Sequence, residues 1–258
     1  MKLPLDADML LMRACTTPEV QVEACIDAAS DIWTRWADRK KAREVYWEHV
    51  DRFVEYYEAD RTDVIHCFTQ GSTFRKQLSS DYKWNRKKPK PIGYGSLKQE
   101  LCEMPNAVMH DMVEADDLLG IFATQLKARK ENYAVLSGDK DLKQIPGRTM
   151  WIDMEEVYNS QESATRQFWL QTLKGDSTDG VKGCPAIGEK RAEEIVSGFD
   201  LEDEMGCWKK VVEQFGKKGK DEAFALQQAR LVRILKNGEY DFFTQTVDLW
   251  NPTKSCSV

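Results

Sequence analysis

Five short apolar runs occur along the first part of the chain, and longer segments with helical spacing separate them. The runs lie at residues 2–6, 64–68, 107–109, 133–136 and 149–152. Their length and their β-branched or aromatic content predict strands. Between them, Leu118, Ile121 and Leu126 have the spacing of an amphipathic helix over residues 114–129. Strands and helices that alternate in this way predict an α/β fold with a mostly parallel central sheet flanked by helices.

Acidic residues follow several of these runs directly. Asp6 ends the first run, and Asp139 and Asp141 follow the fourth after a Ser-Gly break. Glu114 opens the helix that comes after the third run. The carboxyl ends of parallel strands lie along one edge of a sheet, where α/β proteins place their working site. We therefore expect these carboxylates to converge on one point.

The segment from Glu19 to Asp60 is rich in Ala, Glu, Arg, Lys and Trp and contains no glycine. This composition predicts one or two long helices with a break near Asp38. Core packing is the expected role of the aromatic side chains, and a stacking platform for bases is the alternative. These side chains are Trp33, Trp36, Tyr46, Trp47, Phe53 and Tyr57.

The pattern changes after residue 163, where a glycine-rich loop at 175–188 interrupts a series of predicted helices. Backbone N–H groups in such a loop, opening onto a helix, can bind a phosphate. We therefore divide the chain into an α/β domain, residues 1–163, and a helical region, residues 164–258. The apolar end at 240–252 is expected to pack back on the α/β body.

The overall composition is that of a globular protein. The chain has 258 residues, of which 31 % are charged and 41 % apolar. No apolar run approaches the roughly 20 residues of a membrane helix, and the N-terminus lacks the pattern of a signal peptide. Seven widely spread cysteines, none in a Cys-x-x-Cys pair, suit reduced thiols. These features predict a cytoplasmic protein without membrane contact.

Positive and negative charges are segregated along the chain, although the net charge is −6. Residues 75–98 contain eight Lys or Arg side chains and one acid, Asp81. Acids cluster elsewhere, and a basic stretch beside an acidic pocket suits an enzyme that acts on phosphates. Residues 79–93 have little apolar content and two prolines. They predict a mobile basic loop or a helix that orders on binding.

The acidic clusters together fit a site for divalent cations. Mg²⁺ prefers oxygen ligands and takes a few carboxylates together with substrate phosphates. Two ions can generate a hydroxide and stabilise the leaving oxygen of a phosphoryl displacement. Taken singly, the clusters could instead be helix-dipole partners, a solvated turn or N-cap residues. Their joint occurrence favours the metal site. The residues are Asp6, Glu114, Asp116, Asp117, Asp139, Asp141, Asp176 and Asp179.

Other catalytic schemes find little support in the chain. Only His49, His66 and His110 are present, without metal-type spacing, and there is no Gly-x-Ser-x-Gly elbow. The pair Asp6 and Asp8 could indicate an aspartyl-phosphate phosphatase. That interpretation explains neither the basic stretch nor the glycine-rich loop.

Three motifs, in this order, resemble the 5′-nuclease (flap endonuclease) superfamily, and in particular the 5′→3′ exonucleases of short-tailed bacteriophages. They are Glu114-Ala115-Asp116-Asp117, Ser137-Gly138-Asp139-Lys140-Asp141-Leu142 and Gly175-Asp176-x-x-Asp179-Gly180-Val181-x-Gly183-x-x-x-Ile187-Gly188-x-Lys190-Arg191-Ala192. The likeness extends over nearly the whole chain, including Phe74-Arg75-Lys76 and Leu249-Trp250-Asn251-Pro252. It implies a PIN-like 5′-nuclease fold with a helix–three-turn–helix DNA-binding subdomain.

The resemblance also implies roles for individual residues. A first Mg²⁺ or Mn²⁺ ion would be bound by Glu114, Asp116 and Asp6, with Asp117 close by. A second ion would be held or oriented by Asp139, Asp141, Asp176 and Asp179. Lys83 and Arg86 would be catalytic residues of a helical gateway that steers the scissile phosphate. The expected DNA-binding residues are Arg75, Lys76, Lys87, Lys88, Gly183, Gly188, Lys190 and Arg191. A K⁺ ion would bind at Val181 and Ile187.

The chain departs from the family pattern in two places. The family usually has an aspartate at the end of the second strand, where we place Gln70. A neutral amide there predicts weaker metal binding at the first site, or compensation by Asp8. Lys182 and Ala186 replace the usual Pro and Gly of the duplex-binding loop.

The sequence therefore predicts a divalent-metal-dependent 5′→3′ exodeoxyribonuclease or structure-specific flap endonuclease. Its partner would be DNA with a 5′ end or a 5′ flap, in a host bacterial cytoplasm. A catalytically weakened DNA-binding homologue is the main alternative, and a metal-dependent phosphatase of small substrates is a second one.

Overall fold

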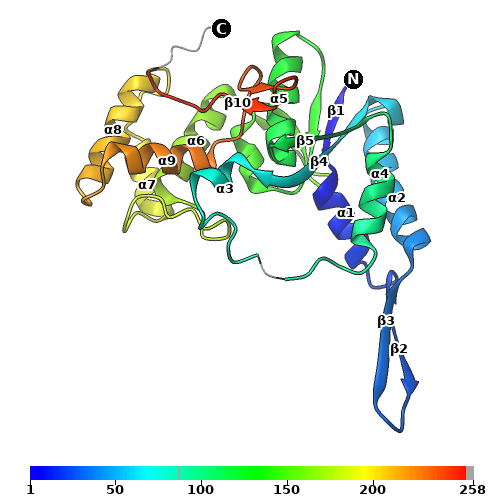
Figure 1. Cartoon of the computed structure of the whole chain (residues 1–258). Coiled ribbons are helices and arrows are strands. Elements are labelled where there is room, and N and C mark those ends of the chain that lie inside the picture. The colour runs from blue at the N-terminus through cyan, green and yellow to red at the C-terminus, as the bar shows by residue number, and fades with distance from the viewer. Residues whose placement is uncertain (87, 254–258) are drawn as a thin grey trace.

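A computed structural model describes residues 1–86 and 88–253 of the chain. Its centre is a six-stranded sheet in the order β5-β4-β1-β6-β7-β8 (Figure 1). The paired strands run parallel except β8, which is antiparallel to β7. The predicted α/β fold with a mostly parallel sheet is therefore confirmed. The bounds are Leu3–Asp6 (β1), Val64–Thr73 (β4), Ala107–Met112 (β5), Ala134–Leu136 (β6), Gly147–Met150 (β7) and Glu156–Asn159 (β8).

Helices cover both faces of this sheet. One face packs against α1 (Ala7–Thr16), α2 (Arg39–Tyr56) and α4 (Tyr94–Cys102), around Leu5, Leu10 and Tyr46. The other face packs against α5 (Ala115–Ala128) through a cluster that includes Leu118 and Val135. Three short helices connect these elements: η1 (Arg61–Asp63), α3 (Phe74–Leu78) and η2 (Lys140–Gln144).

A second group of helices lies beside the sheet (Figure 1). Its buried centre includes Trp169, Trp208 and Phe215. Tyr82, from the basic stretch, packs into the same cluster. The helices are α6 (Gln161–Lys174), α7 (Glu189–Val196), α8 (Glu204–Gly216) and α9 (Glu222–Val232).

The end of the chain contacts both parts of the molecule. Ile234, Leu235 and Tyr240 pack in the cluster formed with α5, whereas Trp250 packs in the cluster of the second helix group. Between them lies a small antiparallel pair, β9 (Tyr240–Asp241) and β10 (Thr246–Val247). Among the described residues, no helix has the length and apolar content that a membrane span requires.

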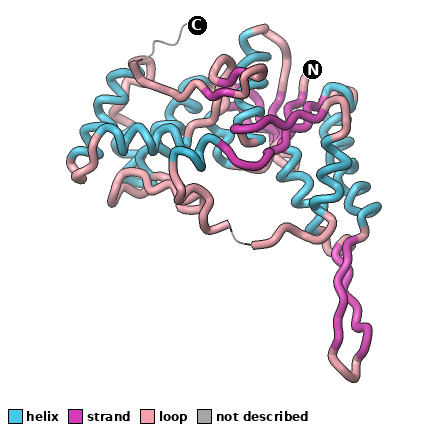
Figure 2. Tube along the Cα trace, in the orientation of Figure 1, coloured by secondary structure: helices cyan, strands magenta, loops and turns pink. Residues whose placement is uncertain are grey.

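The prediction of a helix before Asp38 is wrong. Residues there form an antiparallel hairpin, β2 (Gln21–Asp27) and β3 (Ile32–Ala37), that projects from the body (Figures 1 and 2). Trp33 and Trp36 are 56 % and 45 % exposed, so they are not core residues. The physical reason is the density of β-branched and aromatic side chains around a turn, which favours strands. Asp38 caps α2 by accepting from the Lys41 N–H at 2.9 Å.

Candidate active site

The cleft lies at the carboxyl edge of the sheet. Asp6 ends β1 and caps α1, where its Oδ1 accepts from the Met9 N–H at 3.0 Å. The Ser137 hydroxyl, directly after β6, donates to Asp6 Oδ2 at 3.1 Å. Asp139 follows two residues later. Neighbouring parallel strands thus bring Asp6 and Asp139 to the same edge, as the sequence predicted.

Two further carboxylates reach this edge from the start of α5. Glu114 is the N-cap residue, and Asp116 lies in the first helical turn. Glu114 is buried, whereas Asp116 is partly exposed. A cavity of about 510 Å³ is lined by Asp6, Glu114, Asp116 and Asp139 together with Lys83.

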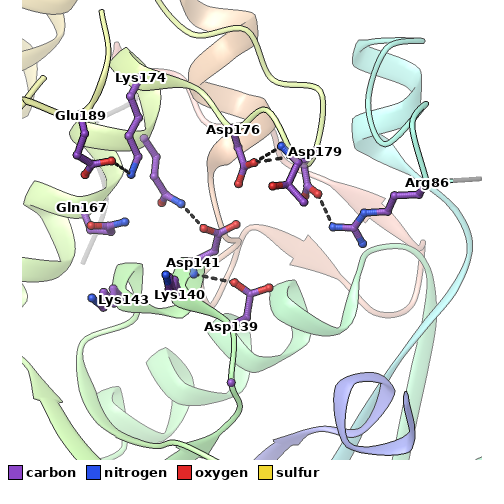
Figure 3. A pocket seen from close by; sticks show the side chains of 13 residues that line it. Arg86, Asp139, Lys140, Asp141, Lys143, Gln167, Lys174, Asp176, Asp179 and Glu189 are labelled. Atoms are coloured by element: carbon purple, nitrogen blue, oxygen red, sulfur yellow. Dashed lines mark hydrogen bonds and ion pairs between the residues drawn. The ribbon is translucent and has the colours of Figure 1, made fainter. Parts of the chain in front are cut away.

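The remaining acids line an adjoining cavity of about 580 Å³. Figure 3 shows Asp139, Asp141, Asp176 and Asp179 around one space, with Arg86 at its edge. Asp139 and Arg86 line both cavities, so the two hollows lie side by side, and Glu114, Asp116, Asp141, Asp176 and Asp179 all border a third, smaller space. Four separate segments of the chain therefore supply carboxylates to one cleft.

Three of these carboxylates have raised pKa values. Burial, followed by the charges of Asp8 and Asp139, raises the pKa of Asp6 to about 6. Burial also raises the pKa of Asp141 to about 6, with contributions from Asp139, Asp176 and Asp179. The pKa of Asp116 lies well above its usual value, because the walls of the cleft shield its carboxyl group from water although part of the residue is exposed, and because the charges of Asp6 and Asp139 oppose its ionisation. Such carboxylates repel one another unless a proton or a cation lies between them.

Cationic side chains from the basic stretch enter the cleft. Lys83 Nζ lies 2.7 Å from Glu114 Oε1 and 3.5 Å from Asp179 Oδ2. Arg86 forms an ion pair with Asp179. Burial alone would raise the pKa of Glu114, but the charges of Arg75 and Lys83 outweigh it and lower that pKa. The Lys83 N–H also donates to the Asp179 carbonyl at 2.8 Å, so this part of the stretch is folded against the glycine-rich loop.

The donor set fits a hard divalent cation, because it consists of carboxylate oxygens without sulfur or imidazole. As the side chains lie, no three acidic, His or Cys groups among the described residues are close enough to hold an ion. Lys83 and Arg86 are paired with Glu114 and Asp179 instead. These two cations offset part of the negative charge of those carboxylates.

Comparison with known proteins identifies the family. A family model described as the N-terminal, resolvase-like domain of 5′-3′ exonucleases matches residues 39–169, just over half of the chain. The chain belongs to the 5′-3′ exonuclease family. As a member, it is a nuclease, that is, a phosphodiester hydrolase, and the resemblance noted in the sequence is confirmed.

Relatives and solved structures of the family extend the likeness. The exonuclease of Escherichia phage T7 is 29 % identical, over 97 % of this chain and 93 % of that protein. The flap endonuclease Xni of Vibrio campbellii is 27 % identical, over 77 % of this chain and 83 % of its own length. A bacteriophage T5 flap endonuclease, solved in a pseudo-enzyme-product complex with DNA and metal ions, has a TM-score of 0.59 at 18 % identity. That match covers 89 % of this chain and 88 % of the T5 chain.

Two residues predicted for the functional site lie in the interior of this exonuclease-family member. Asp117 is 0 % exposed and receives two hydrogen bonds from the Arg75 guanidinium, at 2.6 and 2.7 Å. Arg75 is 3 % exposed. Asp117 is therefore not available as a metal ligand, and Arg75 does not reach a DNA surface. The reason is that each side chain neutralises the other in the core.

Gln70 does not line the cleft, so its neutral amide is not placed to weaken the first metal site. Thr69 lines it instead, and its hydroxyl accepts from the Ala115 N–H at 3.0 Å. Asp8 lines the cleft as well. Its carboxylate already accepts from the Thr69 N–H, the Tyr94 hydroxyl and Lys98 Nζ, at 2.7, 2.8 and 2.7 Å.

Some of the residues expected to bind DNA or K⁺ are exposed, and others are buried. Gly188, Lys190 and Arg191 are exposed at the start of α7, and Lys76 and Lys88 are also exposed. Lys87 lies outside the described residues. The Gly183 N–H donates to Gln228 Oε1 at 3.1 Å, so it is not free for a phosphate. Val181 and Ile187 are buried, and the Val181 carbonyl accepts from the Asp176 N–H at 2.9 Å.

Sequence reasoning missed three residues that support the carboxylates. The Tyr82 hydroxyl donates to Glu114 Oε2 at 2.7 Å. The Gln171 amide donates to Asp141, and Gln144 donates to Gln171. Tyr82 could have been suspected from its place beside Lys83. No pattern in the sequence marks Gln144 or Gln171, because an amide side chain gains this role only from its tertiary neighbours.

Proposed function

We propose that the chain is a divalent-metal-dependent 5′→3′ exodeoxyribonuclease that also cuts 5′ flaps, hydrolysing DNA phosphodiesters with two metal ions. The observation that carries this proposal is the single cleft in which Asp6, Glu114, Asp116, Asp139 and Asp141 meet. Family membership supports the reaction class. The DNA and metal ions in the related T5 structure support the substrate and the cofactor.

In this proposal the carboxylates form two groups. Asp6, Glu114 and Asp116 hold the first Mg²⁺ or Mn²⁺ ion. The second group consists of Asp139, Asp141, Asp176 and Asp179. When bound, such ions lower the pKa of water and stabilise the charge that develops on the phosphate. The raised pKa values of Asp6, Asp116 and Asp141 support this assignment, because cations would relieve the repulsion between them.

Lys83 and Arg86 steer the scissile phosphate. Both cations already lie at the carboxylate cleft, on Glu114 and Asp179. Metal ions at these carboxylates would weaken both ion pairs, so Lys83 and Arg86 would then be available to contact the phosphate of the incoming strand. Their flexible stems can make this change without moving the sheet. Lys83 and Arg86 then orient the phosphate and neutralise part of its charge.

The helical region from residue 164 onward is proposed to grip duplex DNA as a helix–three-turn–helix element. The exposed start of α7, with Gly188, Lys190 and Arg191, supports this, because a helix N-terminus with adjacent cations attracts phosphate. Lys76 and Lys88 would contact the strand nearer the cleft. We also propose that a K⁺ ion binds near the backbone of Val181 and Ile187. The protein is proposed to work in a bacterial cytoplasm.

Cleavage of end-labelled DNA tests the proposal. Duplex, 5′-flap and single-stranded DNA, each labelled at the 5′ end, are incubated with Mg²⁺ and then with excess EDTA. We expect cleavage from the 5′ end and at the flap in Mg²⁺ only. DNA binding without cleavage would identify a weakened DNA-binding homologue. A parallel incubation with p-nitrophenyl phosphate detects a phosphatase, which would hydrolyse this small substrate and leave the DNA uncut. Asp153→Asn, at an exposed position that lines neither of the two cavities, is the matched control for Asp116→Asn.

A further inference from the structure

Arg75 joins three parts of the molecule that are far apart in sequence. Its guanidinium donates twice to Asp117 at the start of α5, and once to Glu114 Oε2 at 3.3 Å. It also donates to the carbonyls of Leu231, in the last turn of α9, and of Arg233, the residue that follows this helix. These five hydrogen bonds use the full donor capacity of a buried arginine.

Asp117 is the partner through which Arg75 acts on the cleft. Its Oδ2 accepts from the Glu114 N–H at 3.0 Å, which closes the capping box of α5. Its Oδ1 accepts from the Leu235 N–H at 3.2 Å. The turn that carries Glu114 and Asp116 is therefore fixed on one side by Asp117, and Asp117 by Arg75.

Residues 231–235, which we call the connecting segment, also support the second group of carboxylates. Gln144 donates to the Val232 carbonyl at 2.7 Å and accepts from the Ile234 N–H at 3.4 Å. The same amide donates to Gln171, whose own amide donates to Asp141. One segment thus contacts the supports of both carboxylate groups.

The fit between the connecting segment and α5 leaves no spare room. A Cβ atom on Gly120 would lie 2.3 Å from the Leu235 carbonyl oxygen and 2.6 Å from Ile234 Cγ2. The backbone of the segment therefore approaches α5 as closely as glycine permits. A shift of the segment would be transmitted to α5 and to its acidic first turn.

We propose that Arg75 and Gln144 are positioning residues that hold the two carboxylate groups in place relative to each other for metal binding. Arg75 holds the Glu114–Asp116 turn, Gln144 holds Asp141 through Gln171, and the connecting segment joins them. This inference rests on the proposed metal-dependent function. Because α9 runs directly into the segment, the helical region that would bind DNA is tied to the geometry of the metal site.

Calorimetric titration of Mn²⁺ into the DNA-free protein tests this role apart from catalysis. The variants are Arg75→Lys, Gln144→Leu and, as a matched control, Arg129→Lys at an exposed position. Lysine keeps the charge of Arg75 but cannot donate to a carboxylate and two carbonyls in one plane. We expect Arg75→Lys and Gln144→Leu each to weaken one Mn²⁺ site by about 10- to 100-fold, the range for groups that orient metal ligands. The control should bind as the unaltered chain does.

The outcomes separate this proposal from the proposed function. If the unaltered chain binds two Mn²⁺ ions but cuts no DNA, the nuclease assignment fails, and the positioning role is still judged on affinity. If Arg75→Lys and Gln144→Leu only lower the melting temperature and keep full Mn²⁺ affinity, the two residues are merely structural and the inference is overturned. Should Arg75→Lys not fold, Asp117→Asn replaces it, with the same expected loss at one site.

Discussion

Neutralising Asp6 is expected to stabilise the metal-free protein while it removes activity. Asp6 is 6 % exposed, and its pKa is raised from 3.8 to about 6 by burial and by neighbouring acids. Asparagine keeps the oxygen that caps Met9 and a polar partner for Ser137, so Asp6→Asn removes the charge with little change in shape. The substitution therefore isolates the electrostatic contribution of one carboxylate.

The magnitude follows from the shift in pKa. About two pKa units at roughly 1.36 kcal/mol each correspond to about 3 kcal/mol of unfolding free energy. The folded pKa of Asp6 lies above its unfolded value, so the contribution of this one group to stability is complete below about pH 3.8 and is lost as the pH rises to about 6. Above that window Asp6→Asn should be the more stable protein by about 3 kcal/mol. For a chain of this size the melting temperature should rise by roughly 6–12 °C.

Thermal and urea unfolding in EDTA, on both sides of the pH window, measures this effect. Asp153→Asn serves as the control, because a surface substitution should change stability by about 0.5 kcal/mol or less. Near pH 7.5 we expect the stabilisation, and near pH 4 we expect the difference to shrink. Equal stability of Asp6→Asn and the wild type in EDTA near pH 7.5 would show that Asp6 is not under electrostatic strain. A gain that is the same at both pH values would refute the protonation mechanism.

Three further predictions concern the cleft, the basic stretch and the hairpin. Asp116→Asn should lower kcat by roughly 10²–10³-fold, as the loss of one organised electrostatic group does. DNA affinity, measured in a gel-shift assay, should be retained. Wild-type turnover in this variant would refute the metal-site assignment. Lys83→Ala and Arg86→Ala should slow cutting, and each should reduce the salt slope of DNA binding by about 0.9. Unchanged turnover and slope in both variants would exclude the gateway role. Trp33→Ser should change stability by about 0.5 kcal/mol or less, whereas Phe53→Ala should destabilise by about 3–5 kcal/mol. A large loss with Trp33→Ser would contradict the exposed hairpin.

The sheet and the acidic cleft were predictable because local signals and topology agree there. Asp6, Glu114 and Asp139 follow apolar runs, and parallel strands have to place such residues along one edge. Helix α5 was predictable for the same reason, since its apolar spacing, its acidic first turn and its length all indicate a helix.

The errors arise where tertiary contacts decide between two locally acceptable states. Residues 21–37 lack glycine, so only Asp27, Ser30 and Asp31 mark the turn between β2 and β3, a weaker signal than the alanine and charged residues that favour a helix. Asp116 and Asp117 are adjacent and chemically identical, yet one lines the cleft and the other pairs with Arg75 in the core. Only the path of the chain at the end of α9 distinguishes them, because the carbonyls of Leu231 and Arg233 there are the further acceptors for Arg75.

The most direct test of two-metal binding in the carboxylate cleft is diffraction from crystals soaked in Mn²⁺, with the anomalous signal measured near the manganese edge. We expect one Mn²⁺ ion bound by Asp6, Glu114 and Asp116, and a second ion among Asp139, Asp141, Asp176 and Asp179. We also expect Lys83 to have left Glu114. Anomalous peaks that lie only outside this cleft, with Lys83 still on Glu114, would contradict two-metal binding there.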